Sequence, residues 1–206
     1  RPVADRQALN AALRIEKLAI MRGNRMVLRD FSLYAAQREI IWIKGANGSG
    51  KSTLMRGIAG LLPHLAGHCT FEGRLALADE QSALDIDQTP DEALRFWARF
   101  DGAGGDEIEK ALLAFDLVSL ADIPIRLLSA GQKRRVALAR LAASGADIWL
   151  LDEPYNALDQ ANVARLDSAI SGHSARGGIA LIASHIAPGI GVSQSIALDR
   201  QDKKTA

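Results

Sequence analysis

Gly45-Ala46-Asn47-Gly48-Ser49-Gly50-Lys51-Ser52 is the stretch that decides the fold of this chain. It fits the pattern G-x-x-x-x-G-K-[S/T], and residues 40–43, just before it, form the apolar run Ile-Ile-Trp-Ile of a buried strand. A loop of small residues exposes successive backbone N–H groups to phosphate oxygens, and a helix that begins near Gly50 directs its positive dipole end at the same anion. The stretch therefore predicts a strand, a phosphate-binding loop and a helix, with a nucleoside triphosphate as the ligand.

Lys51 and Ser52 have separate predicted roles in this loop. The Lys51 ammonium would reach the outer phosphates, and the Ser52 hydroxyl would ligate Mg²⁺. Since glycine makes up about 7% of residues in proteins, a chance match in a chain of this length has odds of roughly one per cent. The apolar residues that follow supply one face of the expected helix, so the context agrees with the pattern.

Composition limits the class of protein. The 206 residues suit one domain, and 25 basic against 24 acidic residues leave a net charge of +1, so no nucleic-acid partner is expected. The single cysteine, Cys69, cannot form an internal disulfide, as is usual in a reducing compartment. No run of 18 uncharged apolar residues occurs, and the first residues do not have the pattern of a secretory signal.

The first third of the chain predicts a small antiparallel unit. Strands are expected over residues 13–20 and 26–33, and the pair Gly23-Asn24 between them indicates a hairpin turn. A further pair of short strands is expected near residues 69–71 and 74–77, after the helix that follows the phosphate loop.

The remainder predicts helices and then a parallel sheet. Residues 91–122 have apolar side chains three and four apart, with Gly102, Gly104 and Gly105 dividing the pattern into two helices. Strands at 148–151, 179–183 and 196–198 alternate with a helix at 161–170. We therefore expect a single α/β domain over residues 1–206, with a central, mostly parallel sheet, an antiparallel β lobe and an inserted helical segment at about 90–142.

A second nucleotide motif ends one of these strands. Asp147-Ile148-Trp149-Leu150-Leu151-Asp152-Glu153 is a buried-strand pattern that places two carboxylates at the carboxyl edge of the sheet, where ligands of open α/β sheets bind. Asp152 would hold Mg²⁺, and Glu153 would orient and polarise the attacking water. The alternative is that the pair only ends the strand in solvent, which the preceding phosphate loop disfavours.

A third stretch narrows the family. Leu128-Ser129-Ala130-Gly131-Gln132 alone indicates only an N-cap and a turn before a helix. It continues as Lys133-Arg134-Arg135-Val136-Ala137 and is followed by the Asp-Glu strand, by Ala157-Leu158-Asp159 and by His185. In order and spacing these motifs resemble the ATP-binding-cassette (ABC) ATPases, over nearly the whole chain. The basic residues 133–135 are expected on a solvated or dimer-facing surface rather than on nucleic acid.

The resemblance implies a P-loop NTPase fold of the ABC type that binds ATP and Mg²⁺. It implies catalytic roles for Lys51, Glu153 and His185, the last as the residue that contacts the γ-phosphate. It also implies an ATP-sandwich dimer, in which the helix start at Ser129 faces the nucleotide of a second copy. The implied metal ligands are Ser52, Asp152 and Gln81. The implied nucleotide contacts are Gly45, Ala46, Asn47, Gly48, Ser49, Gly50, Lys51, Ser52, Thr53, Arg22, Gln81, Ser129, Ala130, Gly131, Gln132 and Asp159.

At several positions the sequence offers two candidates for one family residue or departs from the usual ABC pattern. Gln81 best matches the glutamine that links the metal to the membrane partner, and Gln88 is a rival for the same role. Arg22 stands where most cassettes stack an aromatic ring on adenine; a planar cation can stack there but weakens the selectivity for the base. Ala130 replaces a signature glycine. Arg38 stands where a turn glycine is usual, and the sequence offers no functional account of it.

A closer resemblance is to the ATPase subunits of bacterial cytochrome c maturation systems. It is carried by residues 123–141 with their signature alanine, by Glu153-Pro154-Tyr155-Asn156-Ala157-Leu158-Asp159 and by Gly177-Gly178-Ile179. This resemblance implies a peripheral subunit on the cytoplasmic face of the bacterial inner membrane, bound to integral-membrane permease subunits. It would couple ATP hydrolysis to haem export or to release of a haem-loaded periplasmic chaperone.

Haem itself is not expected to bind this chain. His64 and His68 are four residues apart, but Pro63 and Gly67 would break a helix that could align them as ligands.

Three other functions compete with this one. The chain could serve an exporter of another cargo, such as a lipid, a peptide or a drug, which the sequence excludes least well. A soluble ABC ATPase acting on DNA or ribosomes would need a basic face, a coiled coil or a second cassette. A regulatory cassette without catalysis is disfavoured because Lys51, Asp152, Glu153 and His185 are all present.

Overall fold

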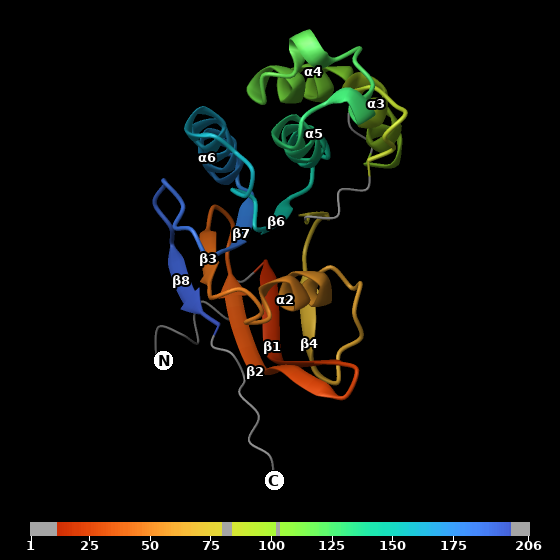
Figure 1. Cartoon of the computed structure of the whole chain (residues 1–206). Coiled ribbons are helices and arrows are strands. Elements are labelled where there is room, and N and C mark those ends of the chain that lie inside the picture. Colours follow the sequence, from red (N-terminus) through yellow and green to blue (C-terminus); the bar gives the residue numbers. More distant parts are fainter. Residues whose placement is uncertain (1–11, 80–83, 102–103, 199–206) are drawn as a thin grey trace.

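The strand-forming segments of the chain make two separate sheets (Figure 1). The computed structural model describes residues 12–79, 84–101 and 104–198. The strands are β1 (Leu13–Arg22), β2 (Arg25–Ala35), β3 (Ile40–Lys44), β4 (Ala66–Phe71), β5 (Leu75–Ala78), β6 (Ile148–Asp152), β7 (Ile179–Ser184) and β8 (Gln194–Ala197). The helices are α2 (Lys51–Ile58), α3 (Pro90–Asp101), α4 (Gly105–Ala114), α5 (Ala130–Ala143) and α6 (Gln160–Ala175), with 3₁₀ turns at Val118–Leu120 and Ile125–Leu127.

The larger sheet has the strand order β5-β6-β7-β3-β8, and each of its described pairings is parallel. Both of its faces are covered. Along β6, Ile148 and Leu150 pack in one hydrophobic cluster and Trp149 and Leu151 in the other, because successive side chains of a strand point to opposite faces. Burial on both sides explains the continuous apolar runs that the sequence shows at these strands.

The smaller sheet is antiparallel, in the order β2-β1-β4, and its first two strands form the expected hairpin. Arg22 pairs with Arg25 across the turn, where Gly23 has a φ of 57°. Leu54 and Met55 of α2 share one cluster with the inner faces of both sheets, so that this helix joins them. The predicted fold class, a parallel sheet with an antiparallel lobe and helices around it, is confirmed.

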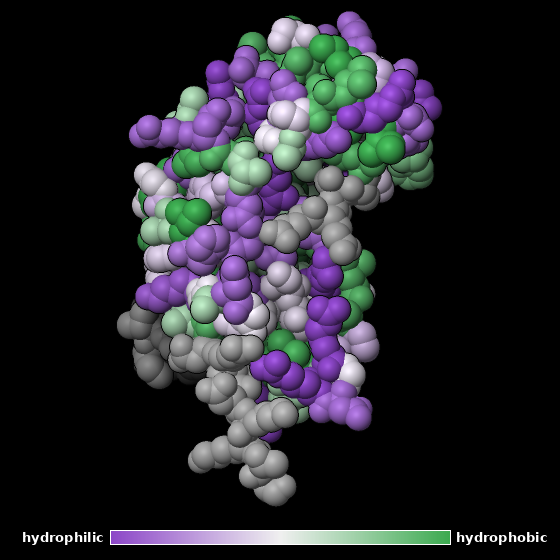
Figure 2. All heavy atoms as spheres, viewed as in Figure 1, coloured by the Kyte–Doolittle hydropathy of each residue, from purple (hydrophilic) through white to green (hydrophobic). Residues whose placement is uncertain are grey.

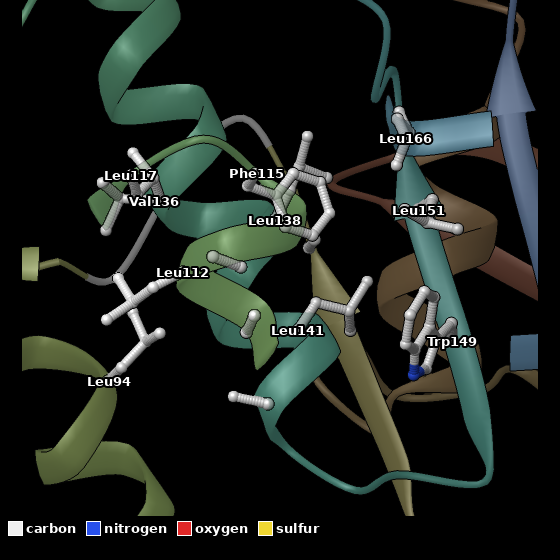
Figure 3. Packing of buried hydrophobic residues seen from close by; sticks show 14 of the residues in the cluster. Leu94, Leu112, Phe115, Leu117, Val136, Leu138, Leu141, Trp149, Leu151 and Leu166 are labelled. Atoms are coloured by element: carbon white, nitrogen blue, oxygen red, sulfur yellow. The ribbon is translucent and has the colours of Figure 1, made fainter. Parts of the chain in front are cut away.

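Helix α5 joins the helical part of the molecule to the parallel sheet. In Figure 3 its Val136, Leu138 and Leu141 lie between residues of the neighbouring helices and the side chains of Trp149 and Leu151 on β6. All five side chains are buried. No helix within the described ranges is long and apolar enough to cross a membrane.

One strand pairing and two helix ends differ from the sequence-based expectation. The segments near 69–71 and 74–77 are strands of different sheets, because β4 pairs with β1 and β5 pairs with β6. The second predicted helix ends at Ala114 instead of continuing to 122, since Asp116 adopts a left-handed φ of 54° that stops it. Helix α6 runs on to Ala175, because the left-handed residue that ends it is Gly177 with a φ of 106°.

Arg38 precedes β3 in a left-handed conformation with a φ of 69°. Its N–H donates to the carbonyl oxygen of Gly178 at 3.0 Å, and its own carbonyl accepts a hydrogen bond of 2.6 Å from the hydroxyl of Ser174. The backbone is thus held in a conformation that glycine adopts at lower cost. This explains physically why a glycine is usual at this turn.

Candidate active site

The phosphate loop lies between β3 and α2 at the carboxyl edge of the parallel sheet. Its turn needs two glycines, because Gly48 and Gly50 have φ values of 79° and 108°. Gly50 is the N-cap of α2, and its carbonyl accepts the first helical hydrogen bond, from Leu54 N–H at 2.8 Å. The N-terminus of α2 therefore points its free N–H groups into the loop, as an anion site requires.

A cavity of about 480 Å³ opens above this loop. The walls come from the loop, from the β1–β2 hairpin and from the segment after β6. The lining residues are Arg22, Arg25, Val27, Asn47, Gly48, Ser49, Gly50, Lys51, Ser52, Thr53, Glu153 and Asn156. Arg22 thus lies where the adenine contact was expected. Arg25, on the other side of the same turn, brings a second guanidinium to this wall.

Three side chains predicted to be catalytic meet at the edge of the loop. The Lys51 ammonium lies 2.9 Å from Glu153 Oε1 and also donates to the carbonyl oxygens of Gly45 at 2.6 Å and Ala46 at 3.1 Å. The other carboxylate oxygen of Glu153 lies 2.8 Å from His185 Nδ1. Lys51 at the start of α2, Glu153 after β6 and His185 after β7 are therefore joined by an ion pair and a hydrogen bond.

The Glu153 carboxylate is held ionised by this group. Burial acts to raise its pKa, but hydrogen bonds from Lys51 and His185 outweigh burial and hold the pKa below its ordinary value. The backbone at Glu153 has a left-handed φ of 46°, and its N–H donates to the carbonyl oxygen of Ala183 on β7 at 2.7 Å. A glutamate is thus fixed in an uncommon conformation at the site, as is frequent for functional residues.

Ser52 and Asp152 are the described residues among the predicted oxygen ligands of a divalent cation. Ser52 is in the first turn of α2 and lines the cavity, whereas Asp152 is the last residue of β6 and is buried. Among the described residues no group of three or more histidine, cysteine, aspartate and glutamate side chains could hold a metal. A hydroxyl and one carboxylate suit Mg²⁺ that takes its other ligands from phosphates and water.

A second cavity, of about 440 Å³, shares Asn47 and Ser49 of the phosphate loop with the first. Its lining includes Trp42, Lys44, Asn47, His185 and Leu198. The His185 side chain, which is 44% exposed and contacts Glu153, thus lines this second cavity, whereas the hairpin arginines line the first.

The signature residues do not line either of these cavities. Ser129 is the N-cap of α5: its hydroxyl accepts from Gln132 N–H at 3.3 Å, and the Gln132 side chain accepts from Ser129 N–H at 2.7 Å. Gly131 faces the carbonyl oxygen of Ala157, since a Cβ added to this glycine would lie 3.0 Å from that oxygen. Ala130 is exposed at the helix start. Within one chain these residues form a capping box beside the segment after β6.

The other predicted positions have different surroundings. Asp159 is exposed and is the N-cap of α6, accepting from Asn162 N–H at 2.9 Å. Gln81 lies outside the described residues. Gln88 accepts a hydrogen bond from Ile125 N–H on its carbonyl oxygen, and it is not among the residues that line the phosphate-loop cavity.

The expectation that residues 133–135 form a solvated or dimer-facing surface is wrong for two of the three, whose guanidinium groups bind backbone carbonyls of their own chain. Arg134 is only 9% exposed and donates to the carbonyl oxygens of Asp79, Asp152 and Glu153. The side chain of Arg135 is 11% exposed and donates to the carbonyl oxygens of Phe115 and Asp116. Arginine can be buried when carbonyl oxygens satisfy its fixed fork of donors, and no local pattern reveals those distant partners.

Sequence reasoning also missed Arg25, Asn156 and the buried surroundings of Tyr155. Tyr155 donates to Asp167 at 2.7 Å, and the other oxygen of Asp167 accepts from Gly189 N–H at 3.0 Å. Burial, followed by the neighbouring carboxylate, raises the pKa of Tyr155. Through these two hydrogen bonds of Asp167, the segment after Glu153 is connected to α6 and to the loop after β7.

His64 and His68 each contact a different group of the protein. His64 Nε2 lies 2.9 Å from the carbonyl oxygen of Gly57, and His68 Nε2 lies 2.7 Å from a carboxylate oxygen of Glu16. His68 belongs to β4, so the two rings are not on one helix.

Comparison with known proteins places these motifs in a family. The family model described as ABC transporter matches residues 28–156. The cytochrome c biogenesis ATP-binding export protein CcmA of Sphingopyxis alaskensis is 46% identical over 179 residues, which cover 87% of this chain and 92% of that protein. The protein of the same name from Novosphingobium aromaticivorans is 48% identical over 183 residues, 89% of each chain.

A solved structure agrees in fold. An ATP-binding subunit of an ABC transporter superposes with a TM-score of 0.84 at 24% identity, covering 92% of this chain and 86% of that one. The two sheets, the phosphate loop beneath its cavity and the extent of these matches lead to one conclusion: this chain belongs to the ABC transporter family and, within it, to the CcmA group.

Proposed function

We propose that this chain is the ATP-hydrolysing subunit of a membrane ABC complex for cytochrome c biogenesis. It would couple hydrolysis to haem export or to release of a haem-loaded periplasmic chaperone. The chemistry rests on one observation, the meeting of Lys51, Glu153 and His185 at the edge of the phosphate loop. The cargo rests on the names of the CcmA relatives, which share more than two-fifths of their aligned residues with this chain.

ATP and Mg²⁺ are the proposed cofactors. The N–H groups of residues 45–53 and the Lys51 ammonium would bind the phosphates, while Arg22 and Arg25 lie on the wall available to the base. Ser52 and Asp152 would hold the cation, whose chemical contribution is to neutralise charge on the transferring phosphoryl group. Gln81 is proposed as a further ligand from the segment after β5.

Glu153 is proposed to orient the attacking water. Its pKa is held below the ordinary value, so it is ionised at neutral pH and can accept a hydrogen bond from that water. The phosphates would compete for Lys51 with Glu153 and two loop carbonyls, which the ammonium contacts. His185 would then contact the γ-phosphate and, through its bond to Glu153, link the phosphate to the segment after β6.

A second copy of the chain would complete each site. Ser129, Ala130 and Gly131 begin a helix at the surface but do not line the phosphate-loop cavity of their own chain. Helix starts bind anions, and this one is free to face the γ-phosphate held by a partner copy. Asp159 is exposed beside it and would communicate between the two copies.

The helical segment at about 90–142 is proposed to contact the integral-membrane permease subunits on the cytoplasmic face of the inner membrane. Figure 2 shows hydrophobic side chains between hydrophilic ones over this end of the molecule. The large exposed apolar residues here are Phe96, Phe100, Leu113, Val118 and Leu127. Several large apolar side chains exposed at one end of a protein are typical of a surface that binds another protein. Direct haem binding by this chain is not part of the proposal.

The test is haem staining of c-type cytochromes in cells that lack the gene, complemented with wild type, Lys51→Ala or Glu153→Gln. If wild type alone restores the stained bands, the cargo and the catalytic assignments are supported together. If cells that lack the gene show the same stained bands as wild-type cells, the cytochrome c role is overturned. The alternative is then an exporter of another cargo. Bands restored equally by Glu153→Gln would overturn the role of Glu153.

A further inference from the structure

A buried arginine of α5 lies directly behind the catalytic edge of the parallel sheet. Arg134 Nη1 donates to the carbonyl oxygen of Asp79 at 2.7 Å, and Nη2 donates to the carbonyl oxygens of Asp152 and Glu153, both at 2.9 Å. The residue is 9% exposed. One guanidinium therefore contacts the ends of two neighbouring strands, β5 and β6, at the edge where the phosphates would bind.

This contact fixes the backbone that carries the Glu153 carboxylate. Glu153 has a left-handed φ of 46°, which costs free energy unless its surroundings enforce it. Its N–H is held by Ala183 on β7 and its carbonyl oxygen by Arg134. The peptide units on both sides of the Glu153 side chain are thus held by groups from other elements, and the side chain is thereby aimed at Lys51 and His185.

The same guanidinium joins three parts of the site. Arg134 lies five positions after Ser129 on the helix that the signature begins. Asp79, whose carbonyl it binds, also pairs through its carboxylate with Arg56 of α2 at 3.0 Å, and α2 begins at Lys51. Figure 3 shows the next turns of α5 packed against β6, so helix and strand form one contact surface.

We propose that Arg134 is a positioning residue for ATP hydrolysis, which holds the main chain of Glu153 and links the placement of its carboxylate to the signature helix. The inference rests on the proposed catalytic role of Glu153. Docking of a second copy at Ser129 would shift α5. Because Arg134 binds the Glu153 carbonyl, this shift would move the main chain of Glu153 as well.

Arg135 offers a matched control on the same helix. It also donates to backbone carbonyl oxygens, those of Phe115 and Asp116, at 3.0 and 2.8 Å. Its partners lie in the helical part of the chain and not at the end of β6. Arg135→Gln therefore removes comparable hydrogen bonds of α5 without touching the Glu153 backbone.

The experiment measures ATPase kinetics and fluorescent-nucleotide binding on the membrane complex purified through a tag on this chain. Arg134→Gln is expected to lower kcat about 10- to 100-fold, since displacements near 1 Å at a reacting group have such effects. The nucleotide Kd should stay within about threefold, because the phosphate loop is intact. Arg134→Lys should recover part of the lost kcat, since it keeps the charge and three donors but not the fork.

A double-mutant cycle separates positioning from general stability. In a Glu153→Gln background, Arg134→Gln should lower the residual kcat less than about twofold, because residues that act through one another are not additive. Full additivity, or a kcat of Arg134→Gln equal to that of Arg135→Gln at equal folded fraction, would overturn the inference. A wild-type complex that hydrolyses no ATP would instead refute the proposed function.

Discussion

At the scale of single residues, Lys51 connects the phosphate loop to Glu153. Its side chain is 4% exposed, and its ammonium pairs with Glu153 and donates to two loop carbonyls. Lys51→Ala is expected to abolish measurable nucleotide binding, because the charge that faces the outer phosphates is lost. Titration with a fluorescent nucleotide measures this. Lys110→Ala, an exposed change on α4, should bind as wild type does, and retained binding by Lys51→Ala would contradict its role.

Glu153 makes stability depend on pH in acid. Its folded-state pKa lies below the ordinary value of about 4.5, so its ionised form stabilises the fold above that pH, and the contribution is lost as pH falls through the folded-state pKa. The melting temperature of wild type should therefore exceed that of Glu153→Gln at pH 7. The difference should shrink steadily below about pH 4.5. A difference that stays constant from pH 7 to pH 3 would show that Glu153 is not held ionised by Lys51 and His185.

Arg38 tests the cost of a left-handed backbone. The conformation costs about 1–2 kcal/mol for a residue with a side chain, and glycine loses about 0.5–1 kcal/mol through the entropy of the unfolded chain. Arg38→Gly should therefore raise the free energy of unfolding by about 0.5–1 kcal/mol, measured by urea denaturation. Arg29→Gly, in the extended strand β2, should instead lower it. Destabilisation by both changes would mean that the Arg38 side chain matters more than its φ.

At the scale of elements, α5 depends on its capping box. Ser129 and Gln132 satisfy each other's N–H groups at the start of the helix that carries Arg134. Ser129→Ala should cost about 1 kcal/mol and lower Tm by about 2–4 °C in the absence of nucleotide. Differential scanning fluorimetry measures the change. Ser168→Ala, exposed within α6, should shift Tm little, and equal shifts for the two variants would argue against the cap.

At the scale of the whole molecule, one chain presents a phosphate site and a separate helix start that does not reach it. Two copies facing each other would bring each helix start to the other's nucleotide. Glu153→Gln should bind ATP, hydrolyse it slowly and accumulate as a dimer on gel filtration with ATP and Mg²⁺. Lys51→Ala should remain monomeric under the same conditions. A Glu153→Gln chain that stays monomeric with ATP bound would contradict the sandwich arrangement.

Most of the fold was predictable because its signals are local. The run at residues 40–43, the glycines of the phosphate loop and the apolar stretch before Asp152 each identify an element from adjacent residues. Helix ends were less predictable. Whether α4 stopped at Ala114 or continued depended on the backbone conformation of Asp116, a residue that can also occur within helices.

By itself the sequence determined the phosphate loop, the paired carboxylates after β6, the N-cap serine of α5 and the family to which these motifs belong, since each depends on neighbours along the chain. Only the tertiary structure decided that β4 and β5 join different sheets, that Arg25 reaches the cavity and that Arg134 is buried behind Glu153. Arg134 and the carbonyl of Asp79 are 55 residues apart. A hydrogen bond between groups so distant in sequence exists only once packing has brought the helix and the strands together.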